Sequence, residues 1–130
     1  MAAEPIKVVL VEDNEVFREL LELLLGLVSD VQVVAAVPDG RSALEAASRA
    51  EPDVVLLDYR LPELDGVETA AALASTWPDA AVVVLSAEAS DGEIEALYDA
   101  GAVRYLTKDS ELDDIVVAIR DAAGRSAALR

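Results

Sequence analysis

The chain has neither cysteine nor histidine among its 130 residues. Their absence excludes a zinc site of the usual type, a thiol nucleophile, a Ser-His-Asp relay and an imidazole general base. Any acid, base or metal chemistry must therefore use carboxylates, hydroxyls, lysine or backbone groups. Aromatic side chains are also scarce, with one Trp, three Tyr and one Phe. The core must be built from aliphatic side chains.

The chain has few basic residues: it contains 10 basic and 26 acidic side chains, and its net charge is -16. An anionic domain repels the phosphates of nucleic acids and the anionic face of a membrane. We therefore expect no direct binding of nucleic acid and no membrane partner. The start, Met1–Pro5, lacks the pattern of a signal peptide, and apolar runs such as Leu23–Val28 are too short to span a bilayer. These features predict a cytoplasmic chain.

Two kinds of segment alternate along the sequence. Short aliphatic runs are typical of strands buried on both faces, and they occur at Ile6–Val11, Val31–Val37, Asp53–Leu57, Ala81–Leu85 and Val103–Leu106. The segments between them have helical spacing, and in the first of these one predicted face carries Phe17, Leu20, Leu21, Leu24 and Val28.

Start and stop signals support this division. Capping residues are predicted at helix starts, and a left-handed residue or a proline at helix ends. The predicted caps are Asn14, Asp39, Ser90 and Ser110, and the predicted ends are Trp77–Pro78 and Gly101.

Alternating strands and helices imply parallel strands joined by right-handed crossovers. Five such units predict a single α/β domain of the flavodoxin-like (βα)5 type, doubly wound around a five-stranded parallel sheet in the order 2-1-3-4-5. In such sheets the functional crevice lies beyond the carboxyl ends of the strands.

Five chemically capable residues fall at those ends: Glu12, Asp13, Asp58, Ser86 and Lys108. Three acids at one crevice repel one another unless a cation joins them, and Mg²⁺ prefers such oxygen ligands. A carboxylate nucleophile needs no base to deprotonate it, and a lysine can neutralise charge on a phosphoryl group. Asp58, on the central strand, is the predicted nucleophile.

Each of these residues also has a plainer interpretation. Acids near a helix start act as caps or complement the helix dipole, which would explain Glu12 and Asp13. Turns favour Asp, which would explain Asp58. Tyr105 on a short strand can be a half-buried packing residue with a wet hydroxyl. A lysine near a helix start opposes the dipole, so the position of Lys108 favours a functional role.

The joint order and spacing of these residues resemble the receiver domain of bacterial two-component response regulators over essentially the whole chain. The resemblance rests on four pieces of sequence: Glu12-Asp13, the segment Asp58 to Gly66, Ser86-Ala87 and Tyr105 to Lys108. The segment from Gly101 to Asp109 is most similar to the NarL/FixJ (LuxR-type) subfamily. Arg104 departs from that subfamily, in which glycine often precedes the aromatic residue.

The resemblance implies a role for each site residue. Asp58 would accept a phosphoryl group from a sensor histidine kinase. Mg²⁺, with Mn²⁺ as an alternative, would be held by Asp13, Asp58 and the backbone carbonyl of Arg60, with Glu12 acting through water. Ser86 and Lys108 would contact the phosphoryl oxygens. The switch residues would be Ser86 and Tyr105.

The same resemblance implies a signalling domain, which is not an enzyme beyond assisting its own phosphorylation and dephosphorylation. Phosphorylation would shift the last two strand-helix units and control transcription through an effector domain absent from this chain. Residues 1–124 would form the receiver, and 125–130 a tail or the start of a linker. A second copy of the chain is a candidate partner. From their positions and opposite charge, Arg60 and Glu88 could pair across the mouth of the site and hinder water.

Three competing functions are compatible with parts of this sequence. A flavin or nucleotide enzyme on this fold needs a phosphate-cradling loop after the first strand, whereas this chain has Glu12-Asp13-Asn14 there. A haloacid-dehalogenase-like phosphatase typically has an acid two residues after its nucleophile, where this chain has Arg60. A receiver-like dimerisation or interaction module that works without phosphorylation remains the alternative.

Overall fold

The computed structural model describes residues 4–61, 64–87 and 89–129, and the side chains of these up to residue 124. The described residues form five strands and five helices in strict alternation: β1 (Ile6–Val11), α1 (Glu15–Gly26), β2 (Val31–Val37), α2 (Gly40–Ala50), β3 (Val54–Asp58), α3 (Gly66–Thr76), β4 (Ala81–Ser86), α4 (Asp91–Asp99), β5 (Ala102–Thr107) and α5 (Leu112–Leu129). The predicted segments therefore all occur, with bounds shifted by a residue or two.

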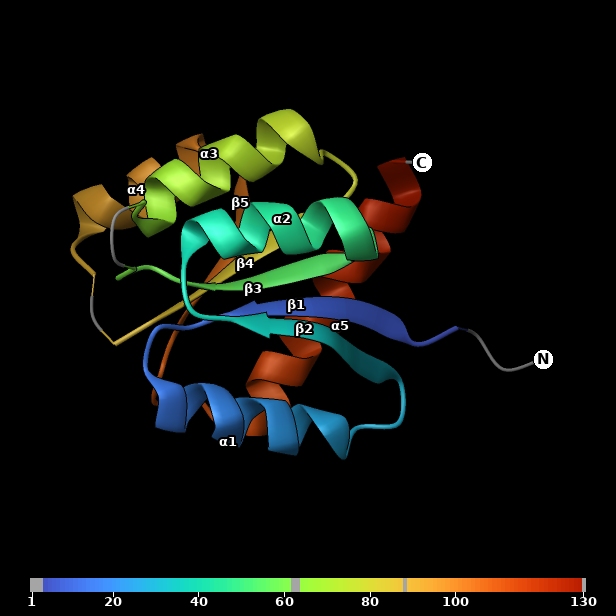
Figure 1. Cartoon of the computed structure of the whole chain (residues 1–130). Helices are drawn as coiled ribbons and strands as arrows, with labels where there is room; N and C mark the ends of the chain where they lie inside the picture. The colour runs from blue at the N-terminus through green and yellow to red at the C-terminus, as the bar shows by residue number, and fades with distance from the viewer. Residues whose placement is uncertain (1–3, 62–63, 88, 130) are drawn as a thin grey trace.

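The strands form one parallel sheet in the order β2-β1-β3-β4-β5. This confirms the predicted doubly wound fold. Helices α1 and α5 cover one face of the sheet, and α2, α3 and α4 cover the other (Figure 1). The two layers enclose separate aliphatic clusters, one including Leu25 and Ile119 and the other including Leu73 and Leu97. Strand β3 is buried along its whole length because it lies at the centre of the sheet between both clusters.

Most of the predicted helix ends are correct. Asn14, Asp39 and Ser90 each accept a hydrogen bond at a helix start, and Ser90 forms a full capping box with Glu93. Gly101 follows α4 with a φ of 117°, a conformation that favours glycine.

Two local predictions were wrong. Helix α5 begins at Leu112, and the backbone N–H of Ile115 donates to the carbonyl of Glu111, so Glu111 stands where Ser110 was expected to cap. The Ser110 hydroxyl lies 3.4 Å from that of Thr107 instead. Leu20 was placed on the buried face of α1, but 47% of it is exposed, because the helix packs on Leu21 and Leu25.

Helix α3 has a capping box that the sequence interpretation did not use. The Asp65 carboxylate accepts from the backbone N–H of Glu68, and the Glu68 side chain accepts from the backbone N–H of Asp65. The backbone N–H of Gly66 also donates to the carbonyl of Tyr59 at 2.8 Å. A Cβ at Gly66 would lie 2.7 Å from the Cα of Tyr59, so only glycine allows the start of α3 to approach the residue after β3 this closely.

Among the described residues, no helix combines the length and apolar character needed to cross a bilayer.

Candidate phosphoacceptor and metal site

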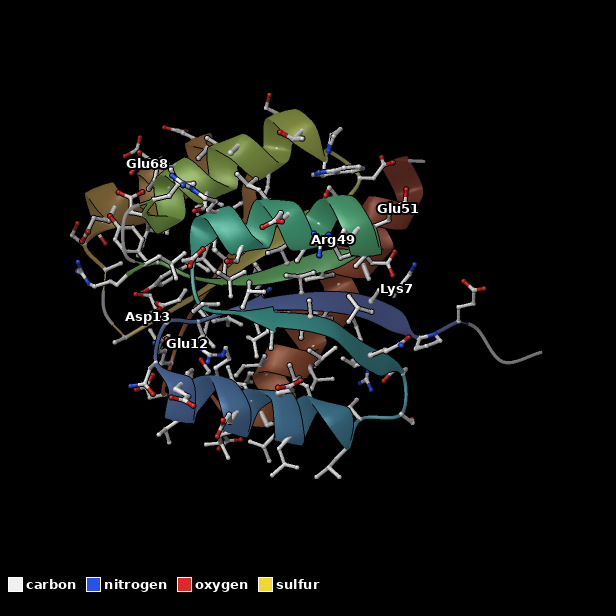
Figure 2. The ribbon with its side chains drawn as sticks, viewed as in Figure 1. Lys7, Glu12, Asp13, Arg49, Glu51 and Glu68 are labelled. Carbon is white, nitrogen blue, oxygen red and sulfur yellow. The ribbon has the colours of Figure 1, made fainter. Side chains whose placement is uncertain are left out.

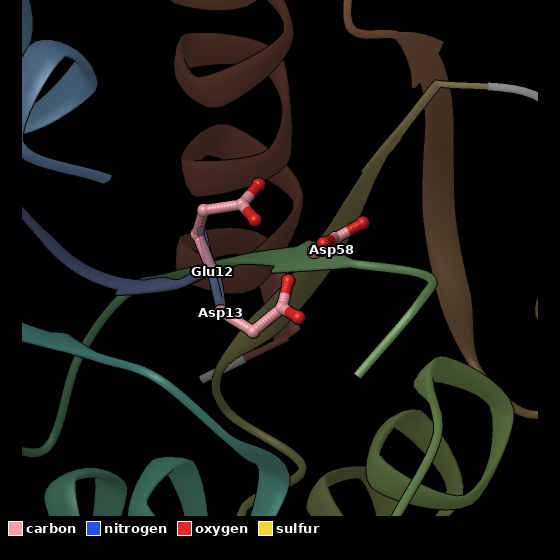
Figure 3. A group of neighbouring side chains, drawn as sticks. All are labelled: Glu12, Asp13 and Asp58. Atoms are coloured by element: carbon pink, nitrogen blue, oxygen red, sulfur yellow. The ribbon is translucent and has the colours of Figure 1, made fainter. Parts of the chain in front are cut away.

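The carboxyl ends of β1 and β3 bring three carboxylates together. Glu12 and Asp13 follow β1, and Asp58 is the last residue of β3. One oxygen from each lies within 4.8 Å of the others, which is close enough for a single cation to contact all three (Figure 3). Asp13 is exposed, while Glu12 and Asp58 are 2% and 4% exposed. The cluster thus has two buried members and one open to solvent.

Lys108 lies beside the two buried acids. Its Nζ is 2.6 Å from Glu12 Oε1 and 3.3 Å from Asp58 Oδ2. The backbone N–H of Lys108 donates to the carbonyl of Ser86 at 2.8 Å, which ties the segment after β5 to the end of β4. Burial opposes the charged ammonium, but the hydrogen bond to Glu12 and the negative charge of Asp58 outweigh it, so the pKa of Lys108 is raised.

The pKa of Asp58 is strongly shifted from its ordinary value. Burial, followed by the negative charge of Glu12, raises its pKa from 3.8 to about 7, although Lys108 acts in the opposite direction. One of its oxygens also accepts a hydrogen bond from the backbone N–H of Arg60 at 3.2 Å. A buried carboxylate with another acid beside it is electrostatically strained, and a divalent cation would relieve that strain.

The second buried acid, Glu12, already has partners for both oxygens. Oε1 faces Lys108, and Oε2 accepts from the backbone N–H of Asn14 at 2.9 Å. Asp13 is more accessible to solvent than Glu12. The donor set fits a hard cation such as Mg²⁺, since it consists of carboxylate oxygens and leaves room for water at Asp13.

The remaining predicted site residues lie on the neighbouring strands. Ser86 ends β4 and is fully buried. Tyr105 lies in β5, is half-buried and packs against the cluster under α3 and α4. Its backbone N–H donates to the hydroxyl of Tyr98 on α4 at 3.1 Å, a contact that the sequence did not indicate.

The predicted pairing of Arg60 with Glu88 stays a prediction. Glu88 lies outside the described residues. The Arg60 guanidinium is 3.9 Å from Glu93, in the first turn of α4, and lies over the ring of Tyr59. The Tyr59 hydroxyl donates a hydrogen bond to the Glu93 carboxylate. This bond, followed by burial, raises the pKa of Tyr59. The loop after Asp58 is thus connected to the start of α4.

Two further contacts around the site were not predicted. Periodicity places Phe17 on the core face of α1, yet the centroid of its ring lies 4.8 Å from Lys108 Nζ. Arg18, the next residue, donates to the carbonyl of Glu12. Their positions, three and four residues after the Asn14 cap, could have indicated these contacts. Side chains in the first turn of a helix tilt toward its N-terminus, and therefore toward the end of the preceding strand.

The family model of the response regulator receiver domain matches residues 8–120 of this chain. The chain belongs to the receiver domain family of response regulators. It is 36% identical over 121 residues to the nitrate/nitrite response regulator NarP of Escherichia coli, and 38% identical over 120 residues to the transcriptional regulatory protein NarL of Mycobacterium tuberculosis. These matches cover 93% and 92% of this chain and 56% of each relative. The chain therefore spans about half the length of these curated relatives.

Solved receiver domains agree with this membership. The signal receiver domain of NarL from Mycobacterium tuberculosis superposes with a TM-score of 0.89 at 38% identity, covering 94% of this chain and 98% of that one. The BeF3-activated receiver domain of RstA from Klebsiella pneumoniae gives a TM-score of 0.81 at 32% identity, covering 90% and 97%. The receiver is a signalling domain, and its similarity to the NarL type confirms the resemblance found in the sequence.

Proposed function

We propose that this receiver accepts a phosphoryl group on Asp58 and that a sensor histidine kinase supplies it. The observation that carries the proposal is the placement of Asp58: a buried carboxylate at the end of the central strand, within 4.8 Å of two other acids and 3.3 Å from the Lys108 ammonium. The phosphorus–nitrogen bond of the donor phosphohistidine breaks and a bond from Asp58 Oδ to phosphorus forms. The leaving imidazole nitrogen keeps the bonding electron pair.

The metal would be held by Asp13, Asp58 and the backbone carbonyl of Arg60, with Glu12 acting through water. The support for this is the donor chemistry, because both oxygens of Glu12 already have partners while Asp13 is exposed. When bound, Mg²⁺ or Mn²⁺ would neutralise charge on the transferring group. Asp58 then serves as the nucleophile.

The neighbouring strands would supply the other contacts. Lys108 would pair with the phosphoryl oxygens, and the Ser86 hydroxyl would donate a hydrogen bond to them. Ser86 would then move and Tyr105 would turn inward, shifting the β4–α4–β5–α5 surface between two states. The hydrogen bond from the Tyr105 backbone N–H to the Tyr98 hydroxyl supports a coupling between β5 and α4.

The wider role is also part of the proposal. We assign residues 1–124 to the receiver and 125–130 to a tail or the start of a linker, in a cytoplasmic regulator. The output would be transcription through a separate effector domain, which the name of the NarL relative, a transcriptional regulatory protein, supports. A homodimer is the proposed assembly. The domain itself would not bind nucleic acid, because its net charge is -16.

Intact mass after incubation with Mg²⁺ and a small phosphodonor such as phosphoramidate tests the proposal. The parent should gain one phosphoryl group. Asp58→Asn should gain none, while Asp53→Asn, five residues earlier at the other end of β3, should behave like the parent. A parent that stays unmodified would favour the phosphorylation-independent interaction module instead.

A further inference from the structure

The Lys108 ammonium has a third neighbour besides the two acids. Its Nζ lies 2.6 Å from Glu12 Oε1, 3.3 Å from Asp58 Oδ2 and 4.8 Å from the centroid of the Phe17 ring. A lysine ammonium at that distance from an aromatic face is attracted by the ring quadrupole, and more strongly where it is shielded from water. The Lys108 side chain is 23% exposed, so it is largely shielded.

The ring itself is held in place by the first turn of α1. The Phe17 backbone N–H donates to the Asn14 side chain at 2.9 Å, and the Asn14 backbone N–H donates to Glu12 Oε2 at 2.9 Å. Arg18 Nη1 donates to the Glu12 carbonyl, also at 2.9 Å. The half-buried Phe17 ring additionally packs against the core under α1 and α5. Its position is therefore fixed relative to the acid that pairs with Lys108.

An aromatic ring can hold the Lys108 ammonium in a way that a further carboxylate beside it could not. Lysine has a flexible aliphatic stem and a compact charge that must be held near its target. Another acid would hold it, but would also repel an incoming phosphoryl group. An aromatic face attracts the ammonium without adding a net negative charge.

We propose that Phe17 is a positioning residue for phosphoryl acceptance: its ring face keeps the Lys108 ammonium beside Asp58, so that the lysine is in place when the phosphoryl group arrives. The inference rests on the proposed function, because it concerns the rate at which Asp58 is phosphorylated. A purely structural Phe17 would need only its volume, which an aliphatic side chain of similar size supplies. The role proposed here needs the ring.

The placement of the lysine can be measured without any phosphorylation. The chain contains two lysines, Lys7 and Lys108, so a protein labelled with ¹³C-lysine gives two sets of side-chain signals. We expect the Lys108 ε-CH₂ protons to be shifted upfield by the Phe17 ring, and Phe17→Leu or Phe17→Met to remove that shift. Lys7, at the opposite end of β1, is the internal control and should not change. A Lys108 signal that is the same in parent and variants would overturn the geometry.

The functional consequence is measured as the initial rate of phosphorylation with Mg²⁺ and phosphoramidate. Phe17→Leu should slow it about threefold to tenfold, the range expected for a shielded cation–π contact. Phe17→Tyr, which keeps a ring, should retain the parent rate. Phe17→Met also lacks the ring and provides the same comparison if the Leu variant does not fold.

A double-mutant cycle separates positioning from general packing. In a Lys108→Ala background, assayed at a higher donor concentration, Phe17→Leu should have no further effect on the rate. The inference is overturned if Phe17→Leu keeps the parent rate, or if it slows both backgrounds equally. If the parent itself takes up no phosphoryl group, the proposed function fails and this inference with it.

Discussion

The two ends of the sheet carry similar residue types and differ in what surrounds them. At the carboxyl end Lys108 contacts the buried Glu12 and Asp58. At the amino end Lys7, with acids at Glu4, Glu51, Asp53 and Asp79, lines an open pocket of about 500 Å³. Figure 2 shows Glu12 and Asp13 at one end of the sheet and Lys7 and Glu51 at the other. Similar side chains thus meet at both ends.

Burial is the difference that matters. The amino-end acids Glu4, Glu51 and Asp79 are exposed, and Asp53 is half-buried, with its carboxylate accepting from the backbone N–H of Lys7 at 2.9 Å. At the carboxyl end burial raises the pKa of Asp58 to about 7. Water stabilises the ionised form of exposed acids. Burial and a neighbouring charge shift the pKa of an acid, and such shifted pKa values are typical of functional sites.

The largest expected effect is on stability, through Asp58→Asn. The Asp58 pKa is about 7 in the folded chain and near 3.8 when unfolded, so the folded state binds this proton more tightly. The free energy of unfolding of the metal-free parent therefore falls as the pH rises from about 4 to about 7. Asparagine stays neutral, so at pH 8 the variant should be the more stable by up to about 4 kcal/mol.

Urea denaturation with a chelator at about pH 5 and pH 8 measures this difference. Adding Mg²⁺ at pH 8 should narrow it, because the cation stabilises the ionised parent and has less to bind in the variant. A difference of the same size at both pH values would contradict the assignment of a strained, buried carboxyl at Asp58.

Exchanging each lysine for alanine compares the two ends directly. Lys108→Ala removes the positive charge beside the phosphoacceptor and should slow phosphorylation on the order of a hundredfold. Lys7→Ala, the matched control at the amino end, should leave the rate unchanged. The initial phosphorylation rates of the parent and of both variants are measured by intact mass and compared. Equal losses in the two variants would mean that the rate follows overall charge rather than position.

Loss of one predicted metal ligand should weaken metal binding. Asp13→Asn is expected to raise the Mg²⁺ concentration needed for half-maximal phosphorylation about 10- to 100-fold. Asp79→Asn removes one charge from an exposed acid at the amino end and is the control. The measurement is the phosphorylation rate over a series of Mg²⁺ concentrations. If both variants shift that concentration alike, Asp13 is not a specific ligand.

The smallest effect is expected at the amino end. Asp53→Ala removes the acceptor for the Lys7 backbone N–H and should cost about 1 kcal/mol of unfolding free energy. Asp53→Asn keeps a side-chain oxygen that can accept the same bond and should cost less. Neither should alter phosphorylation. A slower rate in either variant, measured under the same conditions, would show that the amino end also contributes to the site.

Much of the fold followed from the sequence because the signals were local. Aliphatic runs such as that of β3 and caps such as Asn14 mark their elements without reference to the rest of the chain. Strand ends then indicated that Glu12, Asp58 and Lys108 belong together, and the structure places them in contact. Parallel topology makes this inference possible, because it brings the carboxyl ends of distant strands to one edge.

The failures share a physical cause. Periodicity includes Leu20 in the predicted face of α1 and leaves out Leu25, yet Leu20 is 47% exposed and Leu25 is buried, because packing against the sheet decides which flank of the face is covered. The contact of Phe17 with Lys108 joins residues 91 positions apart (108 − 17) and depends on side-chain conformations that no local pattern encodes. The capping box at Asp65 is different, because its spacing to Glu68 is visible in the sequence although no cap was predicted there.

Locating the phosphoryl group on the chain shows whether Asp58 is the phosphoacceptor. After incubation with phosphoramidate and Mg²⁺, the acyl phosphate is reduced with borohydride so that the modified position survives digestion, and fragmentation of the peptide that carries both Asp53 and Asp58 then identifies it. We expect modification at Asp58 alone, dependent on Mg²⁺ and absent with a chelator. Modification at Asp53, equal modification with a chelator, or none at all would contradict it.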